Sequence, residues 1–245
     1  MEGARLISEH QLALHYPSLW HSVTPLSDGY WAIQNKLMQR EITPPLNNAS
    51  NKSMRGAINE VAFRAFSVLQ SGQNKQIDRA IVQSTIESNA QRVIDYINRL
   101  NSGRTLSLDS FDAACVREAT VLTFRHLYFF PQGSKVTLSP RFKGCGDVAE
   151  CYGDAITNDC LYEIKAGDRN FRISDLRQLL IYSALAYANN DLGFSKIGLI
   201  NPRTGHHWAK SLDQVCRAIA GQSMVDALQN LSDKFSDLNV LMHPN

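Results

Sequence analysis

The chain has 245 residues, of which 44% are hydrophobic and 20% are charged, and its formal net charge is +2. That length suffices for one large domain or for a core with a helical extension, and the small charge neither announces nor excludes a nucleic-acid-binding protein. The first residues lack an apolar signal core, and no run approaches the roughly 20 apolar residues that span a membrane. We therefore expect a cytoplasmic protein with no membrane partner.

The first 108 residues are predicted to form a mostly helical N-terminal region. Helices are expected at 4–15, 28–40, 55–69 and 76–100, with a loop at 43–51 and a glycine cap at 101–103. The helix at 55–69 is the clearest, because its apolar residues recur at the spacing of a single helical face. These helices are expected to cover a catalytic core, bind DNA or hold a partner, and the sequence does not choose between these roles.

Residues 109–245 are predicted to form an α/β core. A helix capped by Asp109 or Ser110 is expected to reach about residue 128. A strand is expected at 135–142, with Pro140 placing it at an edge or a bulge. A closing amphipathic helix is expected at 211–231, and the adjacent His206 and His207 are interpreted as surface histidines.

A β-hairpin is predicted around a two-residue turn at Asn158 and Asp159, because both residue types tolerate the positive φ that such turns need. Counting outward from that turn places Asp154 opposite Glu163. Side chains alternate along a strand, so residue 165 shares the face of residue 163. The intervening pairs are Thr157 with Cys160, Ile156 with Leu161 and Ala155 with Tyr162.

The hairpin therefore gathers Asp154, Glu163 and Lys165 into one cluster. Two facing carboxylates repel each other, and a divalent cation offsets that repulsion better than one lysine does. Mg²⁺ is typically held by one or two carboxylates together with water and phosphate oxygens. A lysine beside it can orient or activate water, and this combination suits phosphodiester hydrolysis.

An amphipathic helix follows the hairpin, capped by Ser174, and a short apolar strand is expected at 197–200. Gln178 and Tyr182 lie one turn apart on this helix, so they face the same cleft.

Asp154, Glu163-Ile164-Lys165 and Gln178-x-x-x-Tyr182 together resemble the PD-(D/E)xK nuclease superfamily, and the last pair resembles its RecB-like branch. The resemblance covers roughly residues 109–203, although Gly153 stands where the family has proline. It implies a restriction-endonuclease-like αβββαβ core and a nuclease that uses Mg²⁺ or Mn²⁺. It further implies that Asp154, Glu163 and the Ile164 carbonyl bind the metal. Lys165 would then orient or deprotonate water, and Gln178 with Tyr182 would position the substrate or the lysine.

Several site assignments remain open at this point. In the family the first core helix sometimes adds a glutamate to the metal site, and Glu118 is the matching candidate, with Glu60 as a rival. Asp147 competes with Asp154, and Glu150 is a minor candidate.

Arg169, Arg172 and Arg177 are expected near the scissile phosphate, with solvated surface arginines as the competing interpretation. The scattered cysteines, among them Cys145, Cys151 and Cys160, are interpreted as small buried thiols.

The expected function is Mg²⁺-dependent hydrolysis of DNA, in the setting of prokaryotic restriction, repair or phage defence that the resemblance implies. A catalytically silent DNA-binding or scaffolding subunit on the same fold is the alternative, and an RNA-processing or small-molecule hydrolase is a third. We also expect a partner protein or a homodimer, because a chain with so modest a net charge would need a second chain to complete its DNA-binding surface.

Overall fold

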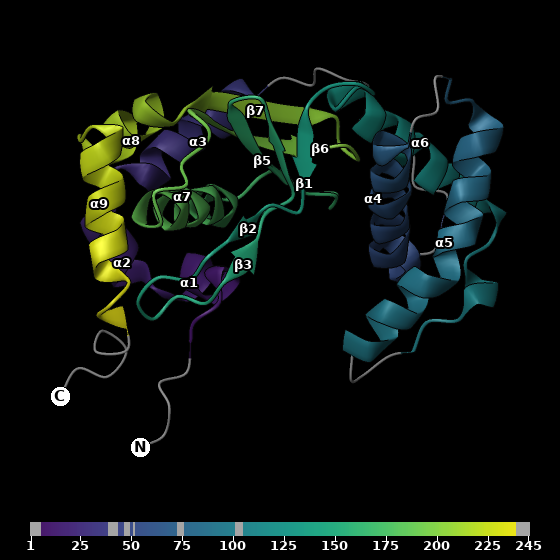
Figure 1. Cartoon of the computed structure of the whole chain (residues 1–245), viewed down its shortest axis with the longest axis horizontal. Coiled ribbons are helices and arrows are strands. Elements are labelled where there is room, and N and C mark those ends of the chain that lie inside the picture. The colour runs from purple at the N-terminus through teal and green to yellow at the C-terminus, as the bar shows by residue number, and fades with distance from the viewer. Residues whose placement is uncertain are drawn as a thin grey trace. The chain divides into compact units, whose positions relative to one another are not determined.

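The computed structural model describes residues 6–38, 44–46, 50, 52–72, 76–100 and 105–238. It is a mixed α/β protein whose contacts divide the chain into two compact units (Figure 1). Unit 1 comprises 1–41, 135–201 and 206–245, and unit 2 comprises 42–134 and 202–205. Each unit has its own buried hydrophobic core. The predicted boundary at residue 108 differs from this division, because the first helices belong to unit 1 and the helix expected at 109–128 belongs to unit 2.

Unit 1 is built on a five-stranded sheet with the strand order β1-β4-β5-β6-β7. β5 and β6 run parallel, and the other neighbouring strands are antiparallel. The strands are β1 (Val136–Leu138), β4 (Ala155–Thr157), β5 (Cys160–Ile164), β6 (Lys196–Asn201) and β7 (His206–Ser211). β7 was not predicted, because its sequence shows no clear alternation of apolar and polar residues.

The strand expected at 135–142 is interrupted in the middle. Ser139 has a φ of 50° and precedes Pro140, which has no backbone N–H to donate to a ladder. The chain therefore leaves β1 and forms β2 (Arg141–Phe142), which pairs with β3 (Cys151–Tyr152) in a separate two-stranded sheet.

The predicted hairpin is confirmed in register. Asn158 adopts a φ of 45°, and the paired residues are Thr157 with Cys160, Ile156 with Leu161 and Ala155 with Tyr162. Helix α7 (Ile173–Ala188) follows the hairpin, packs against β5 and β6, and leads into β6 (Figure 1). Its N-cap is Arg172 rather than the predicted Ser174.

The other helices of unit 1 pack on α7 or on one another. α1 (Glu9–His15) and α9 (Met224–Lys234) pack on α7, while α3 (Ser27–Leu37) packs on α8 (Leu212–Ala220) and α2 (Pro17–Val23) packs on α9. α1 is shorter than expected and starts with a capping box formed by Ser8 and Gln11. The single helix expected at 211–231 is two helices, because Gly221 takes a left-handed φ of 68° and ends α8.

Unit 2 is helical in its described part. Helix α4 (Arg55–Ser71) packs against α5 (Arg79–Leu100) and α6 (Ala113–Phe129), with two short 3₁₀ turns, η1 (Lys52–Met54) and η2 (Leu108–Ser110). Asp112, not Asp109 or Ser110, caps α6, since its carboxylate accepts the N–H groups of Ala114 and Cys115. The expected glycine cap at 101–103 and most of the loop at 43–51 lie outside the described residues.

In the part of the chain that the structure describes, no helix is both long and apolar enough to cross a membrane.

Candidate active site on the β4–β5 hairpin

Asp154 and Glu163 lie beside each other at the open end of the hairpin. Asp154 comes directly before β4, and its Oδ2 accepts the backbone N–H of Ile164 at 2.6 Å. Glu163 precedes that amide on β5. The negative charge of Asp154 raises the pKa of Glu163, which is the electrostatic consequence of two neighbouring carboxylates. The structure thus brings together the two carboxylates that the register predicts.

Glu163 is buried, with only 6% of its surface exposed. Burial is the larger cause of its raised pKa, Asp154 adds to it, and Lys165 opposes it. One carboxylate oxygen, Oε1, accepts a hydrogen bond from Lys165 Nζ at 2.7 Å. The other oxygen, Oε2, is buried and has no hydrogen-bond partner among the described residues. A buried carboxylate oxygen without a partner is unfavourable unless a proton or a cation satisfies it.

Lys165 is fixed at both its backbone and its side chain. Its N–H donates to Ile200 O on β6 at 2.8 Å, which extends the parallel ladder by one residue. Its Nζ donates to Glu163 and to Gln178 Oε1 at 2.8 Å, and lies 3.8 Å from Asp175 Oδ1. The ammonium group is therefore surrounded by three oxygen-bearing side chains from β5 and α7.

Gln178 and Tyr182 extend this network along one face of α7. Gln178 Nε2 donates to the hydroxyl of Tyr182 at 3.0 Å. The Tyr182 ring stacks on Phe142 of β2, with ring centroids 5.0 Å apart and planes at 12°. Burial, and then the charge of Glu163, raise the pKa of Tyr182, so its phenol stays protonated. Glu163, Lys165, Gln178 and Tyr182 thus form one continuous hydrogen-bonded chain.

Asp175 is a residue of this network that was not predicted from the sequence. It is buried, it accepts Arg169 through both carboxylate oxygens at 2.8 and 3.0 Å, and it accepts the N–H of Arg172 at 2.7 Å. Its spacing from Gln178 was the available signal, because residues three apart lie on the same face of a helix.

The three arginines expected near a scissile phosphate have different surroundings. Arg169 is paired with Asp175, which raises the pKa of its guanidinium. Arg172 is exposed at the N-cap of α7. Arg177 stacks over Trp20 at 5.4 Å and lies 3.6 Å from Asp28, so its contacts are with α2 and α3 rather than with the chain of residues around Lys165. Arg169 is joined to that network through its guanidinium group and Arg172 through its backbone N–H, whereas the contacts of Arg177 in the described part of the chain lie elsewhere.

The rival carboxylates have other partners. Asp147 bonds through its backbone to Ile7 and Phe235 and its charge acts on Tyr16, while Glu150 is paired with Arg141. These contacts favour Asp154 as the second carboxylate of the site.

Glu118 and Glu60 both belong to unit 2. Glu118 is buried, forms an ion pair with Arg203 and accepts a hydrogen bond from Ser50 at 2.6 Å. Burial raises the pKa of Glu60, and the charge of Arg64 opposes that shift.

A divalent cation fits the donor set at this site. Asp154 and Glu163 supply two adjacent carboxylates, and Glu163 Oε2 is the buried oxygen that lacks a partner. Within the described residues, no group of three or more His, Cys, Asp or Glu side chains is placed to hold a metal ion. The remaining ligands would come from a backbone carbonyl, water and substrate, as is usual for Mg²⁺.

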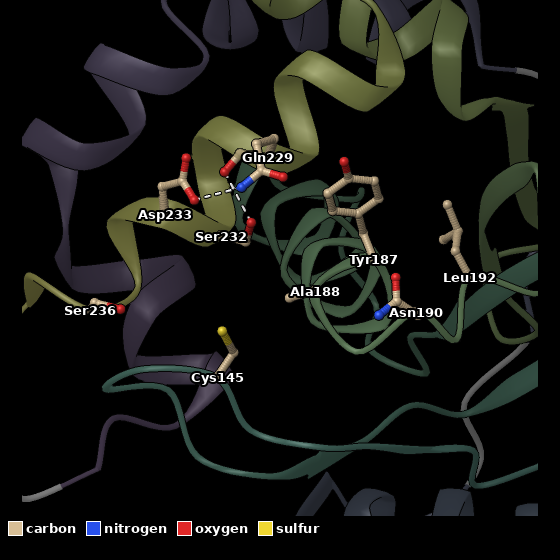
Figure 2. A pocket seen from close by; sticks show the side chains of 9 residues that line it. All are labelled: Cys145, Tyr187, Ala188, Asn190, Leu192, Gln229, Ser232, Asp233 and Ser236. Atoms are coloured by element: carbon tan, nitrogen blue, oxygen red, sulfur yellow. Dashed lines mark hydrogen bonds between the residues drawn. The ribbon is translucent and has the colours of Figure 1, made fainter.

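The described cysteines form no disulfide, and the expectation of buried thiols is confirmed for Cys151 and Cys160 but not for Cys145. Cys151 and Cys160 are buried, and burial raises the pKa of Cys151 to about 12 and that of Cys160 to about 11. Cys145 is partly exposed and lines a hollow of about 630 Å³ beside α7 and α9 (Figure 2). Figure 2 shows Gln229 and Asp233 of α9 bonded to each other there. None of the predicted site residues lines this hollow.

No protein-family model and no curated protein sequence matches this chain. The chemistry of the site is therefore inferred from the geometry of its own residues.

Proposed function

We propose that the chain is a metal-dependent deoxyribonuclease of the PD-(D/E)xK superfamily, in its RecB-like branch, that hydrolyses DNA phosphodiesters. The observation that carries this proposal is the hydrogen-bonded chain from Glu163 through Lys165 and Gln178 to Tyr182, with Asp154 beside its first member. A sheet without catalytic function gains nothing from a buried carboxylate beside a second one, because both desolvation and repulsion oppose it.

The order of elements around the site supports the proposal. Antiparallel strands β1, β4 and β5 are followed by α7 and then by β6, which runs parallel to β5. This order is the one expected for the βββαβ part of the αβββαβ core that the resemblance implies. The helix expected to begin that core, α6, belongs to unit 2.

The residues divide the chemistry between them. Asp154, Glu163 and the Ile164 carbonyl would hold Mg²⁺ or Mn²⁺, which supplies Lewis-acid stabilisation of charge on phosphate oxygens when bound. Lys165 Nζ would orient the attacking water as an ammonium group, or accept its proton as a neutral amine. Gln178 holds the lysine in place, and Tyr182 anchors Gln178 through its hydroxyl. Arg169 is the candidate for a contact with phosphate, because its ion pair with Asp175 links it to the site.

The proposal is tested by cleavage of linear, circular and single-stranded DNA with Mn²⁺ or Mg²⁺, using the wild type, Lys165→Ala and Lys210→Ala. Lys210 is an exposed lysine of β7 and serves as the matched control. We expect metal-dependent cutting that Lys165→Ala lowers by at least about 10²-fold and Lys210→Ala leaves unchanged. Cutting of the circular substrate would identify an endonuclease. Wild-type cutting that Lys165→Ala retains would contradict the proposal.

Metal binding provides a second, independent readout. Calorimetric titration with Mn²⁺ is expected to show binding that Glu163→Gln and Asp154→Asn each abolish. Binding of metal without cutting would point to a missing partner or trigger. Neither binding nor cutting would leave the silent DNA-binding or scaffolding subunit, and preferential digestion of RNA would identify an RNA-processing enzyme.

A further inference from the structure

A basic hollow of about 350 Å³ lies on the surface of unit 2, between helices α4 and α5. Arg64 lines it from α4, and Arg92, Tyr96 and Arg99 line it from α5. None of these residues belongs to the site around Lys165.

The helices bring these side chains together by simple periodicity. Residues 92, 96 and 99 are spaced by four and three, so they lie along one face of α5. A different side of α5 carries Val82, Ile86 and Ile94, which are buried in the core shared with α4. Arg92, Tyr96 and Arg99 therefore remain on the surface, next to the exposed side of α4.

The three arginines have no ion pair or hydrogen bond with any residue in the described part of the chain. Arg203 and Arg125 of the same unit differ in this respect, since Arg203 pairs with Glu118 and Arg125 binds backbone carbonyls. Buried arginines of unit 2 thus stabilise the fold, whereas the guanidinium groups of the hollow have no hydrogen-bond partner among the described residues, and the charge of Arg64 acts on Glu60.

The charge balance of the hollow favours an anionic ligand. Its lining residues carry three positive charges against the single carboxylate of Glu60. Asp95, the nearest acidic residue on α5, accepts a hydrogen bond from Gln91 at 2.7 Å and does not line the hollow. A guanidinium group matches two phosphate oxygens at once, which makes arginine the preferred partner of phosphate.

Tyr96 adds an aromatic surface to this basic group. Its side chain is 48% exposed although it stands between two arginines of the stripe. Basic residues interleaved with exposed aromatic rings are typical of surfaces that bind single-stranded nucleic acid, where bases stack on the ring and arginines follow the backbone.

We infer that the hollow formed by Arg64, Arg92, Tyr96 and Arg99 binds single-stranded DNA. The arginines contact successive phosphates, and Tyr96 stacks on an unpaired base. This inference rests on the proposed function, which is the reason for naming DNA rather than another polyanion as the ligand. It gives unit 2 the task of holding the strand that the site around Lys165 cuts.

Fluorescence anisotropy of a labelled 20-residue oligothymidine tests the inference in EDTA, where metal-dependent cleavage is absent. The double variant Arg92→Ala/Arg99→Ala is expected to lower the slope of log affinity against log salt by about 1.4, because each lost phosphate contact removes about 0.7. Tyr96→Leu is expected to weaken binding about tenfold, and Tyr96→Phe to retain it, since the ring is kept. Arg79→Ala, an exposed arginine of the same helix outside the hollow, is the matched control and should leave affinity within about twofold.

The outcomes separate this inference from the nuclease proposal. Loss of binding in the hollow variants, with folding retained by circular dichroism, supports the inference even if the protein never cuts DNA. If the wild type cuts DNA but the hollow variants bind oligothymidine as tightly as the wild type does, the inference is overturned and the nuclease proposal stands. Equal loss in Arg79→Ala, or equally tight binding of a duplex of the same length, would also overturn it.

Discussion

Lys165 Nζ donates a hydrogen bond to Gln178 Oε1 at 2.8 Å, so a side chain on α7 sets the position of the ammonium group that follows β5. The partner amide nitrogen of Gln178 is in turn held by Tyr182. The orientation of the glutamine is thus determined at both ends.

Replacing Gln178 with leucine should therefore misplace Lys165 without removing it. We expect Gln178→Leu to lower the rate of metal-dependent DNA cutting by about 10²-fold, because small displacements of a catalytic group have effects of that size. Initial rates at saturating DNA measure this. Gln214→Leu, at an exposed position of α8, is the control and should cut at the wild-type rate. Unchanged cutting by Gln178→Leu would show that the amide does not position the lysine.

The ion pair of Arg203 with Glu118 is almost completely buried in unit 2. Arg203 also donates to Asn59 Oδ1 at 2.7 Å. Arg203→Met should lower the free energy of unfolding by about 3–5 kcal/mol, because it leaves a buried carboxylate without its cation. Unit 2 contains no tryptophan in its sequence, so urea unfolding followed by circular dichroism at 222 nm is the suitable measurement.

A double variant separates the charge from the packing at this pair. Glu118→Leu/Arg203→Met removes both charges and should recover most of the lost stability. Arg217→Ala breaks the exposed pair with Asp213 and should have no measurable effect. If the double variant is no more stable than Arg203→Met, the buried charge is not the cause of the loss.

His126 should make unit 2 sensitive to acid. It is buried against Phe66, with ring centroids 5.3 Å apart, and burial lowers its pKa to about 3. The unfolded chain binds a proton at this residue near pH 6.5, whereas the folded chain stays neutral until about pH 3. Between those values the unfolded state holds one more proton, so stability falls as pH falls, by about 2 kcal/mol between pH 7 and pH 5.

Urea unfolding of the wild type and of His126→Phe at pH 7.5 and 5.0 measures this contribution. The variant removes the titrating group, so its stability should differ less between the two pH values than that of the wild type. His126→Gln should lose the same share of the pH dependence. An identical pH dependence in all three proteins would contradict the assignment.

Gly198 on β6 is expected to tolerate no side chain. A Cβ there would lie 2.4 Å from Tyr162 Cε1 and 3.0 Å from the backbone oxygen of Trp208. Gly198→Ala should lower the free energy of unfolding by about 1–3 kcal/mol through overpacking, and tryptophan fluorescence reports on it because all three tryptophans lie in unit 1. Gly29→Ala in α3 is the control, since nothing lies within 4 Å of its Cβ, and it should stabilise the helix by about 0.5–1 kcal/mol. A Gly198→Ala protein as stable as the wild type would show that Tyr162 moves aside freely.

Much of the site was predictable because it depends on local geometry. The two-residue turn at Asn158 set the hairpin register, and the alternation of strand side chains then put Glu163 and Lys165 on one face. Helical spacing likewise placed Gln178 and Tyr182 together. Each of these relationships spans no more than about ten residues, so the residues between them determine it.

The structure differs from the expectation where elements are interrupted. The strand at 135–142 was expected as one element with Pro140 marking an edge or a bulge, and 211–231 as a single helix, and a positive φ at Ser139 and at Gly221 divides them. The contacts also divide the chain differently from the expected boundary at residue 108, because a helix packs on whichever apolar surface buries its stripe, and the periodicity of α6 does not say which surface that is.

The amino-acid sequence was enough to predict the hairpin, the pairing of two carboxylates with a lysine and the polar face of the following helix. The packing of separate elements was needed to show that Asp154 accepts the N–H of Ile164, that Asp175 joins the network and that Arg177 stacks on Trp20 instead. Packing also brings Arg203 into contact with Glu118, 85 residues away in the chain. The physical reason is that turns and side-chain periodicity follow from neighbouring residues, whereas the partner of a buried charge is chosen by how separate elements pack.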